Sequence, residues 1–454
     1  MTDGVPGVTT AREQARASHK AHRYAEAVPL YQRAMREDPL AFDLWLKCGQ
    51  AAADAGMLDV ALPLLGTYAR MSGGDSNAHY SLAYALFRAG RLEDAAAEYR
   101  RSVSLDPTRA SAWCALGQIA YMLGDPAAGW AAHDSALALP SELPLSRFTT
   151  SVVRLLRGDY VRGWADHEAR WDVPQLPRSS WRGEGCRIWD GGDLAGATLH
   201  LHAEGGYGDT LMLARYLPVL RERGIRVRLH AQTGLAPLLR DMVDEIAAPV
   251  LLHDTPDRTA VHCGGFSLPH VLGTTLDTIP TPGGYLTIPE LERPRADGPP
   301  RVGLVWAGNP NVVHDFDRSV PRFDLLAPLL AVEGIDWRSL QLGPRASEAD
   351  GSVLRPAPSL GDYADTARLL TELDLVITVD TSVAHLAGAM GRPVWTMVPT
   401  APEFRWLLDR QDSPWYSSMR LFRRERSDGW TPMLDHVASE LASWRDRHVV
   451  TTAR

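Results

Sequence analysis

A period of about 34 residues runs through the first third of the chain and constrains its fold more than any other feature. Gly56, Gly90 and Gly124 recur at this spacing, and Pro39 and Pro107 lie two periods apart. We expect each glycine at a turn between two helices, where a positive φ is often needed. The pattern predicts an α solenoid built from stacked helical hairpins.

This pattern resembles the tetratricopeptide repeat over about residues 8–141. A degenerate fifth unit follows, in which Gly158-Asp159-Tyr160 keeps the turn, so we expect the repeat domain to cover residues 8–175. Solenoids of this kind expose a groove that binds polypeptide segments, which favours a protein or peptide partner; dimerisation or packing on the neighbouring domain is the alternative. The interface between solenoid and following sheet is expected to contain Trp164, Trp171, Trp181 and Trp189.

The composition of the chain disfavours several classes of protein. The net charge is −8 and no basic block is present, so nucleic acid is disfavoured as a partner. Neither a secretory signal nor an apolar run of about 18 residues is visible, which predicts a cytoplasmic protein without a membrane span. The cysteines Cys48, Cys114, Cys186 and Cys263 are scattered, which indicates isolated reduced thiols rather than disulfides or a zinc site.

The pattern changes after about residue 177. Apolar stretches that read as strands alternate with helical stretches, which predicts parallel sheets with helices on their faces. We expect one α/β half over residues 176–295, with strands at 198–202 and 225–230 and a helix at 210–223. A second half should cover residues 300–454, with strands at 302–306, 340–342, 375–379 and 393–398. Ligands bind such sheets at the carboxyl ends of the strands, so a cleft is expected there.

Two junctions at strand ends carry polar and small residues. The first is Glu204-Gly205-Gly206-Tyr207-Gly208-Asp209, and the second is Asp380-Thr381-Ser382, which opens into a helix containing His385. Free N–H groups at a helix start bind phosphate, although an ordinary helix cap would look the same. The glycine loop is not a dinucleotide fingerprint, because Leu211 stands at the third glycine position; a nicotinamide or flavin cofactor is therefore disfavoured.

Together these residues resemble a known family. Gly208-Asp209-Thr210-Leu211 and the segment from Asp380 to Leu386 resemble GT-B glycosyltransferases of family 9, the lipopolysaccharide heptosyltransferases. With the repeats in front, the chain is similar to bacterial tetratricopeptide-repeat glycosyltransferases, including flagellin-modifying ones. The resemblance implies two Rossmann-like halves, the first on the acceptor side and the second on the nucleotide-sugar side. It also implies inverting transfer of a sugar from a nucleotide donor to Ser or Thr of a protein, without metal or cofactor.

An inverting transfer needs a base near the acceptor hydroxyl and stabilisation of the departing phosphate. The resemblance places the base at Asp209, with a helix cap as the alternative role. Glu204 is a second carboxylate at the same sheet edge and could act instead. Gly205, Gly206 and Gly208 would form the acceptor-side loop, where glycine lets backbone and ligand approach closely.

Donor binding would fall to the second half. The candidates are Trp306, Asn309, Arg318, Gln341, Asp380, Thr381, Ser382 and His385. Each has a structural alternative: core packing for Trp306 and His385, and an ion pair with Asp315 or Asp317 for Arg318. Asp315-Phe316-Asp317 spells a metal-binding DxD, but GT-B enzymes usually need no metal, so none is expected.

Several choices stay open at this point. The acceptor could instead be a saccharide, a lipid or a small peptide, and a decayed domain would leave a non-catalytic scaffold. A homodimer is compatible with the sequence. An ADP-linked heptose suits the family 9 likeness, whereas a CMP-linked nonulosonic acid suits the flagellin-modifying likeness. An acidic sugar would need a cation such as Arg318 or Arg405.

Overall fold

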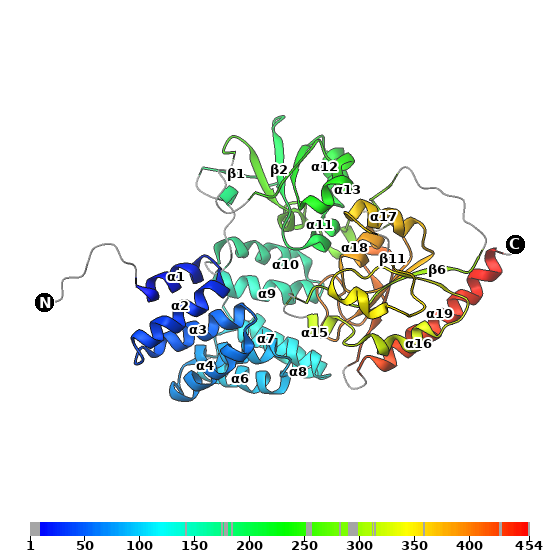
Figure 1. Ribbon diagram of the computed structural model, residues 1–454. Helices are drawn as coiled ribbons and strands as arrows, with labels where there is room; N and C mark the ends of the chain where they lie inside the picture. The colour runs from blue at the N-terminus through cyan, green and yellow to red at the C-terminus, as the bar shows by residue number, and fades with distance from the viewer. Residues whose placement is uncertain are drawn as a thin grey trace. The chain divides into compact units, whose positions relative to one another are not determined.

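The computed structural model divides into two compact units, Met1–Thr150 and Ser151–Arg454 (Figure 1). It describes residues 10–140, 143–173, 176, 180–182, 185–250, 257–280, 283–288, 298–310, 312, 315–356, 359–425 and 429–452. We expected the repeat domain to reach residue 175, whereas the division falls after Thr150. The helices that follow this point therefore belong to the second unit.

The first unit is an α solenoid, as the period predicted (Figure 1). Consecutive helices pair as hairpins, the first with the second, the third with the fourth, and so on. Their bounds are α1 (Ala11–Lys20), α2 (Tyr24–Glu37), α3 (Phe42–Asp54), α4 (Leu58–Met71), α5 (Ser76–Arg88), α6 (Leu92–Leu105), α7 (Ala110–Met122) and α8 (Pro126–Ala138), followed by α9 (Pro144–Leu156), within which the division falls.

Glycines explain how these hairpins close. Gly56, Gly90 and Gly124 lie at the turns between helices with φ of +77°, +72° and +76°, a region that side chains other than glycine rarely adopt. Gly49 and Gly117 serve a different purpose. A Cβ atom at Gly49 would lie 2.6 Å from Leu65 of the paired helix, and one at Gly117 would lie 2.1 Å from His133. The absence of a side chain lets the two helices of a hairpin touch.

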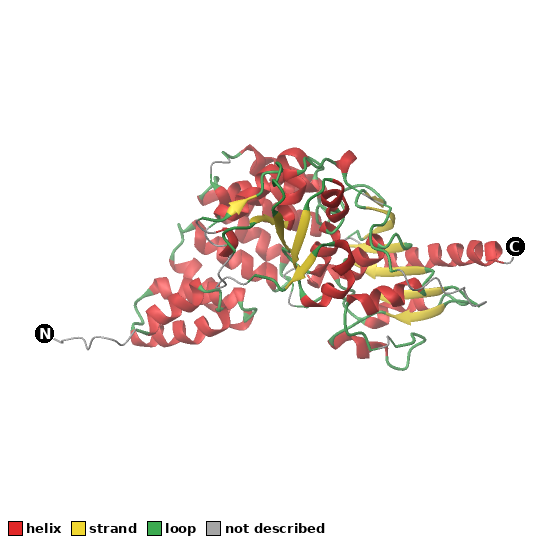
Figure 2. Ribbon diagram, turned by 90° about the horizontal axis from the view of Figure 1, so that it is seen from above, coloured by secondary structure: helices red, strands yellow, loops and turns green. Residues whose placement is uncertain are grey.

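The second unit contains two sheets flanked by helices (Figure 2), so the two α/β halves that the sequence predicted are present. The first sheet has the order β1-β5-β2-β3-β4 and is parallel throughout. Its strands are β1 (Arg187–Ile188), β2 (Thr198–His202), β3 (Arg226–His230), β4 (Glu245–Ala247) and β5 (Val261–Gly264).

The second sheet has the order β10-β11-β9-β8-β6-β7, and β10 with β11 is its antiparallel pair. Its strands are β6 (Arg301–Val305), β7 (Asp336–Ser339), β8 (Leu375–Val379), β9 (Val394–Val398), β10 (Asp412–Ser413) and β11 (Tyr416–Arg423). The strand expected at 340–342 is wrong, because β7 ends at Ser339 and these residues form the loop beyond it. That loop lies at the carboxyl edge of the sheet, where its polar groups can contact a ligand.

Helices of the second unit are mostly short. They are α10 (Tyr160–His167), α11 (Tyr207–Leu213), α12 (Tyr216–Glu222), α13 (Ala236–Leu239), α14 (Leu268–Val271), α15 (Asp315–Arg318), α16 (Ala327–Leu330), α17 (Tyr363–Thr371), α18 (Ser382–Ala389) and α19 (Thr431–Thr452). The single helix expected at 210–223 is wrong: it begins earlier and is split into α11 and α12. Within the described residues, no helix combines the length and apolar character needed to cross a membrane.

The tryptophans expected at the solenoid interface pack inside the second unit. Trp164 of α10 lies edge-on to Phe404, with ring centroids 5.3 Å apart, and Trp415 donates a hydrogen bond to the Tyr160 hydroxyl at 2.9 Å. Trp181 stacks on His202 of β2 with centroids 4.4 Å apart. These contacts attach α10 and the segment after it to both sheets.

Four histidines share one face of the first sheet. They are His200 and His202 on β2, His230 on β3 and His262 on β5, and register pairs His202 with His230 and His200 with His262. His262 donates from Nε2 to a backbone carbonyl at 2.8 Å, so its Nδ1 accepts from His202 Nε2 at 2.9 Å. His230 likewise bonds a carbonyl through Nδ1 and accepts from His200 at 3.3 Å. Each of these two ring–ring bonds needs an unprotonated acceptor nitrogen, so it is lost when the accepting ring is protonated.

Lowering the pH from 7 to 5 is expected to destabilise the second unit. Burial first, and the neighbouring histidines second, lower the pKa of His200 to about 4 and that of His202 to about 2, against 6.5 for an unperturbed histidine. Below pH 6.5 the unfolded chain therefore binds more protons than the folded chain, and stability falls with pH. Urea unfolding at both pH values measures the difference.

A matched pair of variants assigns that pH dependence to the cluster. His200→Leu should flatten the dependence, whereas replacement of His270, which is exposed, should leave it unchanged. Equal free energies of unfolding at pH 7 and pH 5 in the wild-type chain would contradict the prediction.

Candidate functional site

A pocket of about 750 Å³ lies between the two sheets of the second unit. Its walls come from the loops after β2 and β3 of the first sheet and after β6, β7, β8 and β9 of the second, the position expected for a cleft at carboxyl ends. The predicted residues that line it are Gly206, Gly208, Asp209, Asn309, Arg318, Gln341, Asp380, Thr381, Ser382 and His385. Glu204, Gly205 and Trp306 are not among the lining residues.

Asp209 lies in the first turn of α11 and has two partners. Its Oδ2 accepts a hydrogen bond from the Gly206 N–H at 2.7 Å, which caps the helix, and its Oδ1 forms an ion pair with Arg405. Gly205 has φ of +74°, and a Cβ there would lie 2.2 Å from Asp209 Oδ2. Asp209 is thus a capping residue that also presents a carboxylate to the pocket.

Glu204, the alternative base, has a structural role instead. Its carboxylate accepts hydrogen bonds from Arg170 at 2.9 and 3.0 Å and from the Phe266 N–H at 3.0 Å. Arg170 is buried and also contacts Glu168 and Ser267. Because both Glu204 oxygens are bound and the residue does not line the pocket, we correct its assignment from candidate base to ion-pair partner.

Arg405 is the cation closest to the candidate base. It comes from the loop after β9, is 7% exposed, and pairs with both Asp209 and Glu403. Its Nε has no hydrogen-bond partner among the described residues. We considered Arg405 from the sequence as a partner for an acidic sugar. Its position beyond the end of β9 is the signal that could have placed it in the site, since that loop lies at the same sheet edge.

The turn after β8 forms the opposite wall. Asp380 is 6% exposed and lines the pocket, Thr381 is the N-cap of α18, and Ser382 is its first residue. The hydroxyl of Tyr363 donates to Ser382 Oγ at 2.7 Å. Tyr363 and Tyr207, whose rings pack at a tilt, also line the pocket, and the sequence analysis singled out neither of them. Their places, at the first residues of α17 and α11, were the available signal.

His385 is a packed, neutral residue at the back of the pocket. Its Nδ1 bonds the Tyr416 hydroxyl at 2.8 Å, and its ring stacks on Trp406 with centroids 5.3 Å apart. Burial, followed by the charge of Arg405, holds the pKa of His385 well below its usual value. The ring therefore offers an uncharged edge to the pocket. Core packing, the alternative to donor binding, accounts for most of the contacts that His385 makes.

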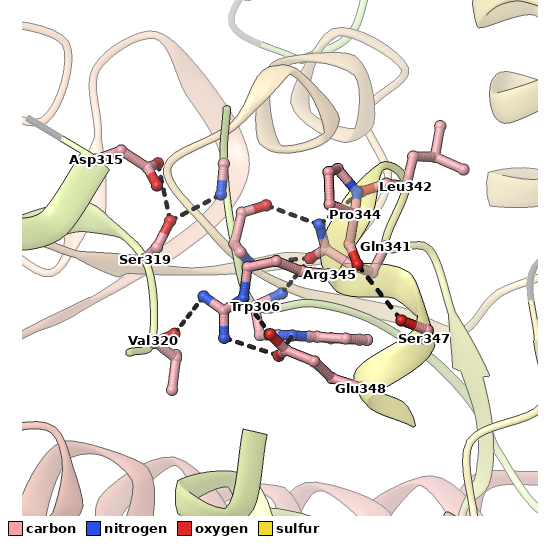
Figure 3. Close-up of polar contacts among 12 residues, drawn as sticks. Trp306, Asp315, Ser319, Val320, Gln341, Leu342, Pro344, Arg345, Ser347 and Glu348 are labelled. Carbon is pink, nitrogen blue, oxygen red and sulfur yellow. Dashed lines mark hydrogen bonds and ion pairs between the residues drawn. The ribbon is translucent and has the colours of Figure 1, made fainter. Parts of the chain in front are cut away.

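Gln341 and Trp306 hold together the loops after β6 and β7 (Figure 3). The Gln341 amide oxygen accepts from the N–H groups of Trp306 at 3.1 Å and Ala307 at 2.9 Å, and its nitrogen donates to the carbonyls of Ala307 and Leu342. The Trp306 ring is fully buried and donates to Glu348 at 3.0 Å. We correct the assignment of Trp306, which is a core residue. Gln341 lines the pocket as expected, and its amide joins two loops.

Arg318 faces the pocket with a weak ion pair. Its Nη2 lies 3.4 Å from Asp315 Oδ1. The same Asp315 oxygen accepts a hydrogen bond from Ser319 at 2.8 Å (Figure 3). The Nε of Arg318 has no hydrogen-bond partner among the described residues. Asp317, the other carboxylate of the DxD sequence, pairs with Arg424. Across the residues that the structure describes, no group of three or more His, Cys, Asp or Glu side chains could hold a metal.

Comparison with known proteins agrees with both parts of the chain. Models of the tetratricopeptide repeat match residues 12–75 and 83–124, and the model of glycosyltransferase family 9 (heptosyltransferase) matches residues 361–421. Two parts of the chain are therefore similar to known families, one to the tetratricopeptide repeat and the other to glycosyltransferase family 9. The family 9 match contains α17, the Asp380–Ser382 turn, His385 and Arg405. This match supports a glycosyltransferase function for the chain.

The relatives differ in the share of this chain that they match. Protein FlbA of Caulobacter vibrioides is 25% identical over 94% of this chain and 82% of its own length. Among solved structures, a thermophilic tetratricopeptide-repeat protein of Thermus thermophilus is 21% identical over 36% of this chain and 90% of its own, with a TM-score of 0.31. MamA from Desulfovibrio magneticus is 20% identical over 28% of this chain and 73% of its own, with a TM-score of 0.28.

Proposed function

We propose that this protein transfers a sugar from a nucleotide-sugar donor to a Ser or Thr hydroxyl of a polypeptide, with inversion at the anomeric carbon. One observation carries the proposal. A single pocket brings the Asp209 carboxylate from the first sheet together with the start of α18 from the second, and Arg405 is bound to that carboxylate. A base and an anion-binding wall are the two elements that such a transfer requires.

In the proposed reaction the acceptor hydroxyl attacks the anomeric carbon as the bond to the donor phosphate breaks. Asp209 takes the hydroxyl proton. The negative charge that develops on the departing phosphate is stabilised by the first N–H groups of α18 and by the guanidinium groups of Arg318 and Arg405. The Nε atoms of both arginines are buried without a hydrogen-bond partner among the described residues, which supports an anionic ligand at this place. No metal or cofactor takes part in this proposal.

The repeats support a polypeptide acceptor. Tetratricopeptide solenoids bind protein segments along their exposed grooves, and models of this repeat match residues 12–75 and 83–124 of the first unit. Flagellin is the acceptor that the resemblance to flagellin-modifying transferases suggests. We place the reaction in the cytoplasm, where nucleotide-sugars are available.

A two-stage experiment tests the proposal. Thermal unfolding is first measured with CMP, UDP, ADP and GDP; a nucleotide at 100 times its Kd stabilises the folded state by about 2.7 kcal/mol. The purified chain is then incubated with the matching nucleotide-sugars and flagellin, and mass spectrometry locates added sugar. Sugar on Ser or Thr is the expected result. Transfer to a saccharide, lipid or small peptide alone would refute the polypeptide acceptor, and no nucleotide-induced shift would favour a non-catalytic scaffold.

Deleting residues 1–141 tests the role of the repeats. We expect transfer to a whole protein acceptor to fall, while hydrolysis of the nucleotide-sugar persists, because the pocket lies entirely within the second unit. Unchanged transfer to the protein acceptor would remove the repeats from acceptor recognition.

A further inference from the structure

The two hydroxyl groups at the start of α18 are bonded differently, which distinguishes their roles. We propose that Ser382 donates its hydroxyl hydrogen to the donor phosphate, and that Tyr363 is the positioning residue that directs it there. This inference rests on the proposed function and names the hydroxyl that recognises the phosphate of the donor.

The Thr381 hydroxyl donates its hydrogen to Thr378. Thr378 donates its own hydrogen to the Val379 carbonyl at 2.7 Å. A hydroxyl has one hydrogen to donate, so the 3.1 Å contact between Thr378 Oγ1 and Thr381 Oγ1 must be donated by Thr381. The Thr381 hydroxyl is therefore committed to the end of β8 and offers no hydrogen to the pocket.

Ser382 has the opposite arrangement. Its Oγ accepts the hydrogen of the Tyr363 hydroxyl at 2.7 Å, which leaves its own hydrogen to donate elsewhere. Burial raises the pKa of Tyr363, so the phenol keeps its hydrogen at neutral pH and acts as the donor. Ser382 lines the pocket beside its own N–H and that of Val383, the first two N–H groups of α18, which have no intrahelical partner. Three donors thus converge on one side of the pocket.

Both walls of the pocket hold Tyr363 in place. It is the first residue of α17, whose N-cap Asp362 accepts from the N–H groups of the next turn at 2.8 and 3.0 Å. Its ring packs on Tyr207, with centroids 4.9 Å apart, and Tyr207 belongs to the glycine loop of the first sheet. The direction of the Ser382 hydroxyl is therefore fixed by residues from both sheets.

A double-mutant cycle on the full chain tests this inference. Nucleotide binding is measured by calorimetry with CMP, UDP, ADP and GDP and with the corresponding nucleosides. Ser382→Ala is expected to weaken nucleotide binding by about tenfold or more, because a hydrogen bond to a charged group is lost. Tyr363→Phe should weaken it by about three- to fivefold, and the double variant should be no weaker than Ser382→Ala. Nucleosides, which lack phosphate, should bind all variants alike.

Two control variants separate this role from general effects. Thr381→Val should change nucleotide affinity by less than about twofold, because the hydroxyl it removes is already bonded to Thr378 of β8. Tyr216→Phe removes a comparable buried phenol bond, to Thr274 at 2.8 Å, away from the pocket, and should leave binding unchanged.

The outcomes are distinguishable. Independent losses from Tyr363→Phe and Ser382→Ala, or an equal loss from Thr381→Val, would overturn the inference while leaving the proposed function intact. If the wild-type chain binds none of the nucleotides, the proposed function fails and the inference fails with it. If Tyr363→Phe lost more stability than Tyr216→Phe and also weakened nucleoside binding, Tyr363 would have a merely structural role and the inference would be overturned. Weaker nucleotide binding with unchanged nucleoside binding would exclude that role.

Discussion

Replacing Asp209 with asparagine is expected to lower the rate constant of sugar transfer by about 10²- to 10⁴-fold, the contribution typical of a general base. Asparagine has the size of the native side chain and can still accept the Gly206 N–H bond that caps α11. It cannot take a proton from the acceptor hydroxyl. Transfer is measured at saturating donor and acceptor, and nucleotide binding is measured separately, where little change is expected.

Glu204→Gln is the matched control, because Glu204 lies at the same sheet edge and was the alternative base. Its carboxylate is bound to buried Arg170, so the variant should lose about 2 kcal/mol in the free energy of unfolding, as expected when a charged hydrogen bond is weakened. Its transfer rate should stay within a few fold of wild type. The reverse pattern, with transfer lost in Glu204→Gln and kept in Asp209→Asn, would assign the base to Glu204.

Much of the fold could be predicted because it is encoded in local spacing. The positions of Gly56, Gly90 and Gly124 located the hairpin turns, since a positive φ is a requirement of single residues. The apolar run 375–379 identified a buried strand, now β8. Because ligands bind at the carboxyl ends of strands, Asp209 and Asp380 could be predicted to line one pocket, although they follow strands of different sheets.

The site predictions that failed concern residues whose hydrogen-bond and ion-pair partners lie far away in the sequence. Asp209 and Glu204 follow the same strand, and the bonds of Glu204 to Arg170 and to the Phe266 N–H hold its carboxylate away from the pocket. Gln341 stands at a strand end, as a binding residue would, but its amide is occupied by the loop around Ala307. Arg405 lies in a loop without periodicity. Such pairings are set by tertiary packing, which local sequence patterns do not encode.

Gly208→Ala is expected to destabilise the second unit and to slow transfer. A Cβ at this position would lie 2.7 Å from His385 Cδ2, across the contact between α11 and α18. The His385 ring is held by its stack on Trp406 and its bond to Tyr416, so α11 must move instead. Overpacking of this kind costs about 1–3 kcal/mol, and a shift of about 1 Å in Asp209 relative to α18 can cost about 10²-fold in rate.

Gly206→Ala, two residues earlier in the same loop, separates this clash from a general effect of replacing glycine. Its φ is −86°, and a Cβ there would lie 3.7 Å from Asp209 Oδ2, an ordinary contact, so stability and rate should stay near wild type. Intrinsic helix propensity alone would make Gly208→Ala stabilising, since alanine is favoured over glycine inside a helix by about 0.5–1 kcal/mol. Reduced denaturant stability and slower transfer in Gly208→Ala alone would therefore identify the α11–α18 contact as the cause. A Gly208→Ala chain as stable and active as Gly206→Ala would show that the two helices tolerate a wider spacing.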